Sequence, residues 1–257
     1  MDITGASAVV TGGASGIGAA SARALAARGA RCALIDLNEE LGEKVAAEIG
    51  GVFVKANVAD AKEVQAAIDA AGEMGPLRAL VNAAGIGKAG RTVDRNGEPH
   101  DLDMFELVLR VNLIGAFNCL RLAAAAMAKT EPLGGDGSRG AVVNIASVAA
   151  FDGQIGQAAY SASKGGMVGM TLPIARDLAS LGIRVNTIAP GLIDTPIYGT
   201  GEKSDAFKEA LGRSVLFPKR LGTADELASM VAELVTNDYM NGETIRVDGG
   251  IRMPPKS

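Results

Sequence analysis

The sequence predicts an α/β fold in which helices cover both faces of one parallel sheet. Short runs rich in Val, Ile and Ala alternate with segments of helical periodicity along all 257 residues, which is the pattern that strands and helices make in such folds. None of the glycine-rich or polar stretches between them resembles a domain linker. We therefore expect one doubly wound (Rossmann) domain over residues 1–257, built on a seven-stranded parallel sheet.

The seven predicted strands recur at regular intervals, with helices in most of the gaps. The strands are expected at residues 6–11, 31–36, 52–55, 79–82, 141–147, 184–189 and 244–247. Three other stretches are loop-like by composition, at residues 85–101, 131–140 and 191 to about 218. Loops at the carboxyl ends of the strands form the ligand site in open α/β sheets. The third stretch, which is long and partly apolar, is the expected substrate loop.

Composition and charge narrow the class of ligand. The chain has 25 Lys and Arg against 29 Asp and Glu, a net charge of -4 and no long basic run, so we do not expect nucleic acid as the primary ligand. Cys32 and Cys119 are far apart and lie outside any C-x-x-C pattern, and His100 is the single histidine. This is too little for a disulfide framework, a metal site or a Ser-His-Asp triad. We expect a small-molecule ligand and no metal.

A helix is predicted from about residue 103 to residue 129. Its most apolar part, residues 113–127, is interrupted by Asn118 and Arg121 and is expected to fall short of a membrane span. It is apolar nearly all round, whereas a helix on a sheet needs only one apolar stripe. We therefore expect self-association through it, unless its alanines serve only helix propensity. No targeting segment is visible in the first 22 residues, so a cytoplasmic location is expected.

A glycine-rich loop follows the first predicted strand. It runs from Thr11 to Gly18 with glycines at positions 12, 13, 16 and 18, and helix formers continue from it. Glycines let the backbone turn tightly and approach a pyrophosphate, whose charge is stabilised by the N–H groups of a helix N-terminus. The second strand ends at Asp36, close to the spacing at which a carboxylate binds the adenosine ribose hydroxyls. A carboxylate there repels a 2′-phosphate, so NAD is expected rather than NADP.

A Tyr, a Lys and a Ser form the candidate catalytic set. Tyr160 and Lys164 are four residues apart on a predicted helix and therefore lie on one face. An ammonium about 4 Å from a phenol contributes roughly 4 kcal/mol at an effective dielectric near 20, so we expect Lys164 to lower the pKa of Tyr160 toward neutrality. Ser147, at the end of the fifth predicted strand, is expected to hydrogen-bond a substrate oxygen. Each residue alone would be read as structural, but together behind a cofactor loop they indicate an active site.

These motifs resemble those of the short-chain dehydrogenase/reductase family over essentially the whole chain. The resemblance is carried by the loop at residues 11–18, by Asn82-Ala83-Ala84-Gly85, by Asn112, by Ser147, Tyr160 and Lys164, and by Pro190-Gly191. It implies hydride transfer between a secondary alcohol or ketone and a nicotinamide.

The resemblance also implies a role for each member of the catalytic set. Tyr160 would be the general acid or base, and Ser147 would orient and polarise the substrate oxygen. Lys164 would lower the pKa of Tyr160 and hold the nicotinamide ribose. Asn112 would position a water that relays protons to solvent.

Carried over position by position, the resemblance implies an NAD site that draws on most of the strand ends. It would be lined by Gly12, Ser15, Gly16, Ile17, Gly18, Asp36, Asn57, Val58, Asn82, Ala83, Gly85, Tyr160, Lys164, Pro190, Ile193 and Thr195. Asn57 departs from the family pattern, which commonly has Asp at this position. An amide oxygen still accepts a hydrogen bond from the adenine amino group, so somewhat weaker adenine recognition is expected.

The resemblance is closest to the 3-hydroxyacyl-CoA dehydrogenase subgroup of the family, at residues 87–101, 146–151, 153–160, 169–178 and 248–253. It implies an acyl-CoA thioester as substrate, held by Ser147, Tyr160 and Gln154, and a homotetramer. A pocket for apolar chains is expected from Leu192, Ile193, Ile197, Leu211, Leu216 and Phe217. Two alternatives stay open: another NAD-dependent secondary-alcohol, steroid or 3-oxoacyl-carrier-protein reductase, and a non-catalytic NAD-binding scaffold.

Overall fold

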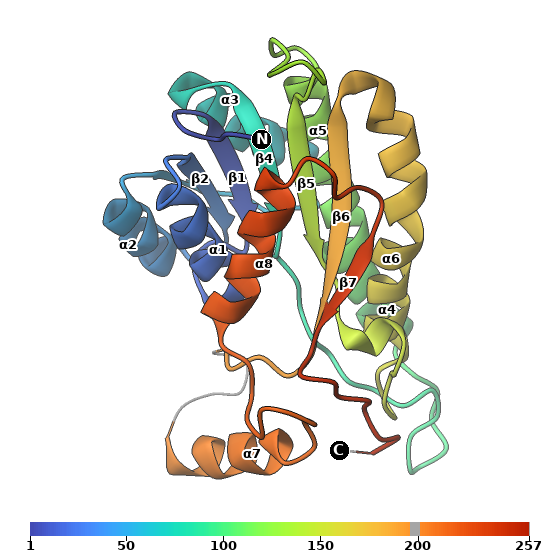
Figure 1. Cartoon of the computed structure of the whole chain (residues 1–257). Helices are drawn as coiled ribbons and strands as arrows, with labels where there is room; N and C mark the ends of the chain where they lie inside the picture. Colours follow the sequence, from blue (N-terminus) through green and yellow to red (C-terminus); the bar gives the residue numbers. More distant parts are fainter. Residues whose placement is uncertain (196–200, 257) are drawn as a thin grey trace.

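Seven parallel strands form one sheet in the computed structural model of the protein, which describes residues 1–195 and 201–256 (Figure 1). All seven lie where the sequence predicts them, in the order β3-β2-β1-β4-β5-β6-β7. Their bounds are β1 (Ser7–Thr11), β2 (Arg31–Asp36), β3 (Val52–Lys55), β4 (Leu77–Asn82), β5 (Gly140–Ile145), β6 (Ile183–Pro190) and β7 (Thr244–Val247). The expected doubly wound α/β fold is confirmed.

Helices connect the strands and cover both faces of the sheet. They are α1 (Gly16–Ala26), α2 (Glu39–Ile49), α3 (Ala61–Met74), α4 (Leu102–Leu109), α5 (Gly115–Met127), α6 (Ala158–Leu178), α7 (Glu202–Gly212) and α8 (Ala224–Thr236). Figure 1 shows α1 and α8 side by side in front of the sheet, with α7 and the C-terminus beyond the carboxyl ends of the strands.

The two faces of the sheet bury different side chains, because successive residues of a strand point to opposite faces. On β1, Ala8 and Val10 belong to the core that includes α1, α2 and α8. Val9, between them, belongs to the core that includes α3, α5 and α6. All three side chains are fully buried. This two-sided burial explains why the strands are continuous apolar runs in the sequence.

The order of the strands reverses between β1 and β4, which are neighbours in the sheet. The Thr11 hydroxyl at the end of β1 accepts hydrogen bonds from the main-chain N–H groups of Ala83 at 3.1 Å and Ala84 at 3.0 Å, just after β4. In open α/β sheets the ligand site lies outside the carboxyl ends of the strands at such a reversal. The fold therefore places the glycine-rich loop and the Asn82–Gly85 segment at one edge.

The predicted helix near residues 103–129 is longer than the apolar stretch that the sequence marked. It consists of α4, a π-helical turn η1 (Arg110–Ile114) and α5. Within the described residues, this 26-residue helix is long and apolar enough to cross a membrane by length and composition alone, which corrects the expectation that it falls short. Half of its most apolar stretch is buried inside the protein, where Cys119, Leu120 and Ala123 pack in the core that includes α3 and α6. This is the environment of a core helix.

Three predictions differ from the structure by two residues or more. The fourth strand begins at Leu77, two residues before its predicted start. The fifth strand ends at Ile145, so Ser147 lies beyond it, where its side chain caps the short 3-10 helix η2 (Val148–Ala150). The stretch from residue 191 to about 218 contains the helix α7, which its glycines and prolines concealed at the level of composition. The helix shows itself in the sequence only through short apolar pairs four residues apart, such as Ala206 and Ala210 or Phe207 and Leu211.

A substitution at Leu34 tests the core between the sheet and the helices α1 and α2. The Leu34 side chain, on β2, is fully buried there. We expect Leu34→Ala to lower the free energy of unfolding by about 2–5 kcal/mol, because it removes apolar contacts and leaves a cavity. Leu41→Ala, on the exposed part of α2, serves as the control and is expected to cost under about 1 kcal/mol. Urea unfolding measures both values, and equal effects would contradict this description of the core.

Candidate active site at the carboxyl edge of the sheet

The glycine-rich loop is shaped by contacts that only glycine permits. Gly12 and Gly16 have positive φ angles of 67° and 51°. A Cβ on Gly12 would lie 2.9 Å from the carbonyl carbon of Ala83, and one on Gly18 would overlap the carbonyl oxygen of Gly12. The loop is therefore pressed against the end of β4 and folds back on itself before α1 begins.

The N-terminus of α1 is open to an anion. Ser15 is its N-cap residue with an extended backbone, and its side chain makes no capping hydrogen bond. The first turn, which contains Ile17, has no acidic residue. Unpaired N–H groups and the positive end of the helix dipole fit a pyrophosphate, so this cradle suits the dinucleotide that the sequence predicts.

Asp36 lies beside this loop at the end of β2. Its Oδ2 accepts from the main-chain N–H of Ala14 at 3.2 Å, and its Oδ1 accepts from that of Asn38 at 3.0 Å. Each carboxylate oxygen keeps further lone pairs that can accept from ribose hydroxyls. The structure thus brings the predicted acid next to the predicted phosphate cradle.

The predicted adenine-side residues lie after β3. Val58 is buried, whereas Asn57 is exposed. The Asn57 side-chain oxygen accepts from the main-chain N–H of Ala59 at 3.0 Å, and its own N–H donates to Glu63 at 2.6 Å. Asn57 therefore stabilises a local turn before α3, which an Asp at this position would do as well.

Lys164 lies at the centre of the candidate catalytic set. Its side chain is only 5 % exposed, and its ammonium donates to the carbonyl oxygen of Ile145 at 2.8 Å and lies 5.7 Å from the centre of the Tyr160 ring. Burial lowers the pKa of Lys164 to about 8. The lysine is thus held next to the tyrosine by the carbonyl at the end of β5.

The pKa of Tyr160 moves in the direction opposite to the one that the sequence predicts. Burial raises it, and a hydrogen bond with the side chain of Ser147 offsets only part of that effect. The Lys164 ammonium donates to the Ile145 carbonyl and lies over the face of the Tyr160 ring. In the protein without cofactor it therefore does not lower the pKa of the Tyr160 phenol below its ordinary value. The contact with Ser147 confirms that the fold brings the two hydroxyls together.

Asn112 joins the helix that carries Tyr160 and Lys164 to the segment that follows β4, through hydrogen bonds to Ser163 and Ile86. It lies in the π-helical turn and is fully buried, with its side chain accepting from the N–H of Ile86 at 2.8 Å and donating to the carbonyl of Ile86 at 3.0 Å. A Cβ on Gly85 would lie 3.2 Å from Asn112 Oδ1 and 3.5 Å from Lys164 Nζ. Both predicted residues therefore border the space that a side chain at position 85 would fill.

Ser163 is a site residue that the sequence analysis did not single out. Its hydroxyl donates to the main-chain carbonyl of Tyr160 at 2.7 Å and accepts from the Asn112 side chain at 3.1 Å. It thereby joins α6 to the π-helical turn. The only signal in the sequence is its place between Tyr160 and Lys164, which does not separate it from an ordinary helix serine.

The remaining predicted residues lie around the same edge. Asn82, at the end of β4, is buried and donates to Asn144 on β5 at 2.9 Å. Pro190 ends β6, and Ile193 is buried and pairs with Gly222, while Thr195 is half-buried. Gln154 lies in the loop before α6, where its side-chain nitrogen donates to the carbonyl of Pro254 at 3.0 Å. Its nitrogen is thus partly committed to the C-terminal segment.

The predicted apolar pocket is only partly assembled in the described residues. Leu216 and Phe217 are 67 % and 82 % exposed, while Leu192 and Leu211 are half-buried. Ile197 lies outside the described residues. A cavity of about 160 Å³ is lined by Leu192, Ile193, Val215, Gly249 and their neighbours, between the ends of β6 and β7. Large exposed apolar side chains next to this cavity suit an apolar ligand.

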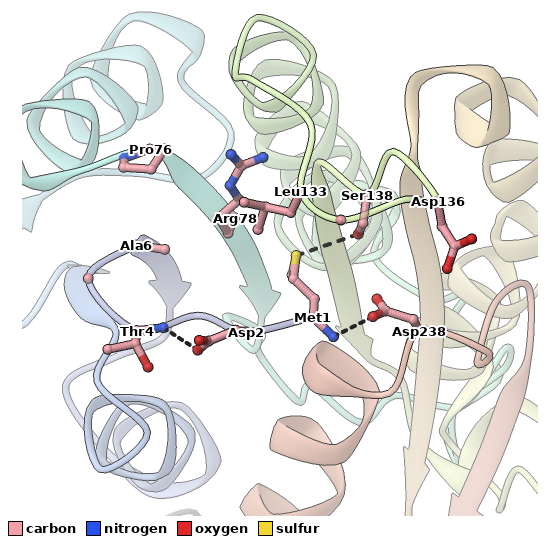
Figure 2. A pocket seen from close by; sticks show the side chains of 12 residues that line it. Met1, Asp2, Thr4, Ala6, Pro76, Arg78, Leu133, Asp136, Ser138 and Asp238 are labelled. Atoms are coloured by element: carbon pink, nitrogen blue, oxygen red, sulfur yellow. Dashed lines mark hydrogen bonds and ion pairs between the residues drawn. The ribbon is translucent and has the colours of Figure 1, made fainter.

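A separate cavity of about 510 Å³ opens at the opposite edge of the sheet (Figure 2). Figure 2 shows it between the segments that precede β1, β4 and β5, with the Met1 amine bonded to Asp238. Among the residues that the structure describes, no predicted site residue lines it. Although this cavity has the larger volume, the candidate active site is at the other edge of the sheet, where Tyr160 and Lys164 lie close together.

Comparison with known proteins defines the family. The model of the short chain dehydrogenase family matches residues 6–205. The 3-hydroxyacyl-CoA dehydrogenase type-2 of Rattus norvegicus is 51% identical over 257 residues, covering 98% of this chain and 97% of that protein. A 3-oxoacyl-[acyl-carrier-protein] reductase of the same species is 34% identical, over 95% of this chain and 97% of its own length. The crystal structure of 3-hydroxyacyl-CoA dehydrogenase type-2 from Mycobacterium avium has a TM-score of 0.93 and 47% identity, with 98% of each chain covered.

The chain therefore belongs to the short-chain dehydrogenase/reductase family. It is an oxidoreductase enzyme that uses a nicotinamide cofactor and acts on a small-molecule substrate. The resemblance predicted from the motifs is confirmed.

Gly18→Ala tests the cofactor cradle. A methyl group at this position overlaps the Gly12 carbonyl, so the loop must move away from the pyrophosphate position. We expect the Kd for NADH, measured by fluorescence titration, to rise about tenfold or more, equivalent to at least about 1.4 kcal/mol. Gly72→Ala is the matched control, because its added Cβ meets no atom within 4 Å. An unchanged Kd in Gly18→Ala would contradict the placement of the cofactor.

The free protein also allows the Tyr160 phenol to be titrated. Because burial raises its pKa, the phenolate of Tyr160 is expected to form above pH 10, the ordinary midpoint for tyrosine. The near-ultraviolet phenolate absorbance of the wild type minus that of Tyr160→Phe isolates one of three tyrosines. A midpoint below pH 10 without cofactor would show that the ammonium, rather than burial, controls the phenol.

Proposed function

We propose that this enzyme interconverts 3-hydroxyacyl-CoA and 3-oxoacyl-CoA by hydride transfer with NAD(H). The observation that carries the proposal is that Ser147 contacts Tyr160, that Tyr160 faces Lys164, and that Lys164 lies near Gly85. Gly85 follows the strand β4, at the strand reversal where the phosphate cradle also lies. Identities of 51% and 47% to proteins named 3-hydroxyacyl-CoA dehydrogenase type-2 support the choice of substrate.

Tyr160 transfers the proton in this proposal. When bound, the nicotinamide accepts or donates the hydride. In the oxidative direction the Tyr160 phenolate takes the proton of the 3-hydroxyl while the hydride leaves C3, and in the reductive direction the phenol returns it. Because burial favours the neutral phenol in the free protein, reduction of the 3-oxo group starts from the protonation state that the fold already provides.

Ser147, Lys164 and Asn112 support that transfer. The Ser147 hydroxyl, in contact with that of Tyr160, donates to the substrate oxygen and stabilises the negative charge that develops on it. Lys164, with its pKa lowered to about 8, remains mostly charged at neutral pH and binds the ribose. Asn112, buried beside Gly85, positions the water through which protons leave the site.

Asp36 supports NAD over NADP. Its two oxygens are fixed by the N–H groups of Ala14 and Asn38, so the carboxylate cannot turn away from the ribose position without losing both bonds. A 2′-phosphate placed there would meet a like charge. This argues against an NADPH-using reductase, whereas an NAD-dependent reductase of carrier-protein substrates would keep the same carboxylate; a 3-oxoacyl-[acyl-carrier-protein] reductase is among the relatives. At Asn57 the uncharged amide is proposed to weaken adenine recognition slightly.

A homotetramer is part of the proposal, and the long helix α4–η1–α5 supports it. Leu102, Leu107, Ile114 and Phe117 on this helix are 46–66 % exposed. Large apolar side chains gathered along one helix are covered in a stable assembly.

The enzyme assay tests the proposed function directly. With acetoacetyl-CoA, we expect the wild type to oxidise NADH, with kcat/KM at least about tenfold above that for NADPH because of the Asp36 carboxylate. Tyr160→Phe is expected to lower kcat by about 10²–10⁴ while NADH binding is kept, since only the proton donor is lost. Tyr239→Phe, a fully exposed tyrosine, is the matched control. Absence of turnover in the wild type would rule out this substrate class, and an unchanged Tyr160→Phe would rule out the mechanism.

Assembly is tested by light scattering at micromolar concentration. We expect the mass of four chains of 26.1 kDa, and a smaller mass for Ile114→Lys with Phe117→Lys, which place charges on the exposed apolar face. A wild-type monomer would overturn the proposed assembly.

A further inference from the structure

The loop at residues 151–157 connects two of the proposed catalytic residues. It follows η2, which Ser147 caps, and it ends where α6 begins, two residues before Tyr160. Gln154 lies within it. The contacts that hold this loop therefore determine how the Ser147 and Tyr160 hydroxyls face one another and where Gln154 lies. Catalysis is sensitive to misplacements of about 1 Å.

Arg246, on β7, binds this loop from the neighbouring edge of the sheet. Its Nη2 donates to Asp152 in the loop at 2.7 Å, and its Nε donates to Asp248 at 2.7 Å. Nη2 also donates to the main-chain carbonyl of Ile251 at 2.9 Å, and the guanidinium lies 5.5 Å from the centre of the Phe151 ring. One planar cation thus joins the loop, the turn after β7 and the C-terminal segment.

The C-terminal segment at residues 251–255 runs beside the same loop. The Gln154 side chain donates to the carbonyl of Pro254, and the Ile155 N–H donates to the carbonyl of Pro255, both at 3.0 Å. One of the two amide hydrogens of Gln154 is thereby committed to the segment. Its oxygen and its other hydrogen have their direction set by that bond.

The charges around Arg246 keep this connection ionised at neutral pH. The hydrogen bond from Arg246 lowers the pKa of Asp152. Asp248 also meets Arg252 at 3.3 Å, so two carboxylates face two guanidinium groups. Both partners of the Arg246–Asp152 pair are about four-fifths buried, where a charge-assisted bond is stronger than on an open surface.

We propose that Arg246 is a positioning residue that fixes the hydroxyls of Ser147 and Tyr160 relative to one another. It does so by joining the loop between them to Asp248 and to the C-terminal segment. This inference rests on the proposed function, because the alignment matters only where Tyr160 transfers the proton.

The kinetic test compares two Arg→Lys variants. In Arg246→Lys the charge stays but the planar fork that holds both carboxylates is lost. Arg23→Lys is the matched control, because Arg23 binds Glu48 through two bonds of 2.7 and 2.8 Å between α1 and α2, away from the loop. With acetoacetyl-CoA, we expect kcat to fall about tenfold in Arg246→Lys and to stay within about twofold of the wild type in Arg23→Lys, with the KM for NADH unchanged in both. Equal kcat values in the two variants would overturn the proposal.

A second test needs no substrate. The hydrogen bond with Ser147 lowers the pKa of Tyr160, so loosening the loop should raise the midpoint of the Tyr160 titration in the free protein. We expect an upward shift in Arg246→Lys and in Asp152→Asn, no further shift in the double variant, because both break one connection, and none in Arg23→Lys. A purely structural role would lower the Tm without moving this midpoint, and that result would overturn the proposal.

The two tests also separate this inference from the proposed function. If the wild type reduces no 3-oxoacyl-CoA, the proposed function fails on the wild type alone. The Tyr160 titration still decides between a positioning role and a structural one. Should Arg246→Lys fail to fold, Asp152→Asn, which keeps the shape of the side chain, provides the same comparison.

Discussion

The close contact between the glycine-rich loop and the chain after β4 is the constraint on which the rest of the site depends. Thr11 binds the N–H groups of Ala83 and Ala84, and Gly12 approaches the same backbone so closely that no side chain fits. A few residues further on, Gly85 lies against Asn112 and Lys164. The segment from Ala83 to Gly85 thus contacts the glycine-rich loop at one end and lies near the catalytic set at the other. A displacement of this segment changes cofactor binding and proton transfer together.

The buried charge of Lys164 lowers the stability of the folded state. Bringing the pKa of Lys164 from 10.5 to about 8 corresponds to roughly 3 kcal/mol against the charged form. The unfolded chain binds more protons than the folded one between these two pH values, so this group makes the folded state more stable as pH rises from about 8 to 10.5. At neutral pH this penalty is present in full, although the ammonium still donates a hydrogen bond to the Ile145 carbonyl. The fold therefore holds a cation at the site at the expense of stability, as expected of a functional residue.

The strands and the glycine-rich loop could be predicted from the sequence. The strands are continuous apolar runs because both faces of the sheet are covered, and the glycine loop is recognisable because close backbone approaches permit no other residue. The end of β5 was misplaced because Ala146 extends the apolar run of the strand and Ser147 follows it directly, although the Ser147 side chain caps η2. Helix α7 was missed among glycines and prolines. The direction of the Tyr160 pKa was wrong because spacing along a helix gives proximity, whereas burial and the Ile145 carbonyl depend on tertiary structure. For the same reason nothing in the sequence linked Arg246 to Asp152, which are far apart in the chain.

At this edge of the sheet we expect a hydride to pass from the nicotinamide to the 3-oxo carbon of an acyl-CoA. The most direct measurement is a single turnover of acetoacetyl-CoA with NADH deuterated at both C4 positions, followed by mass spectrometry of the product. Direct hydride transfer predicts one deuterium at C3 of 3-hydroxybutyryl-CoA. A product without deuterium, or no product at all from a preparation that binds NADH, would contradict it.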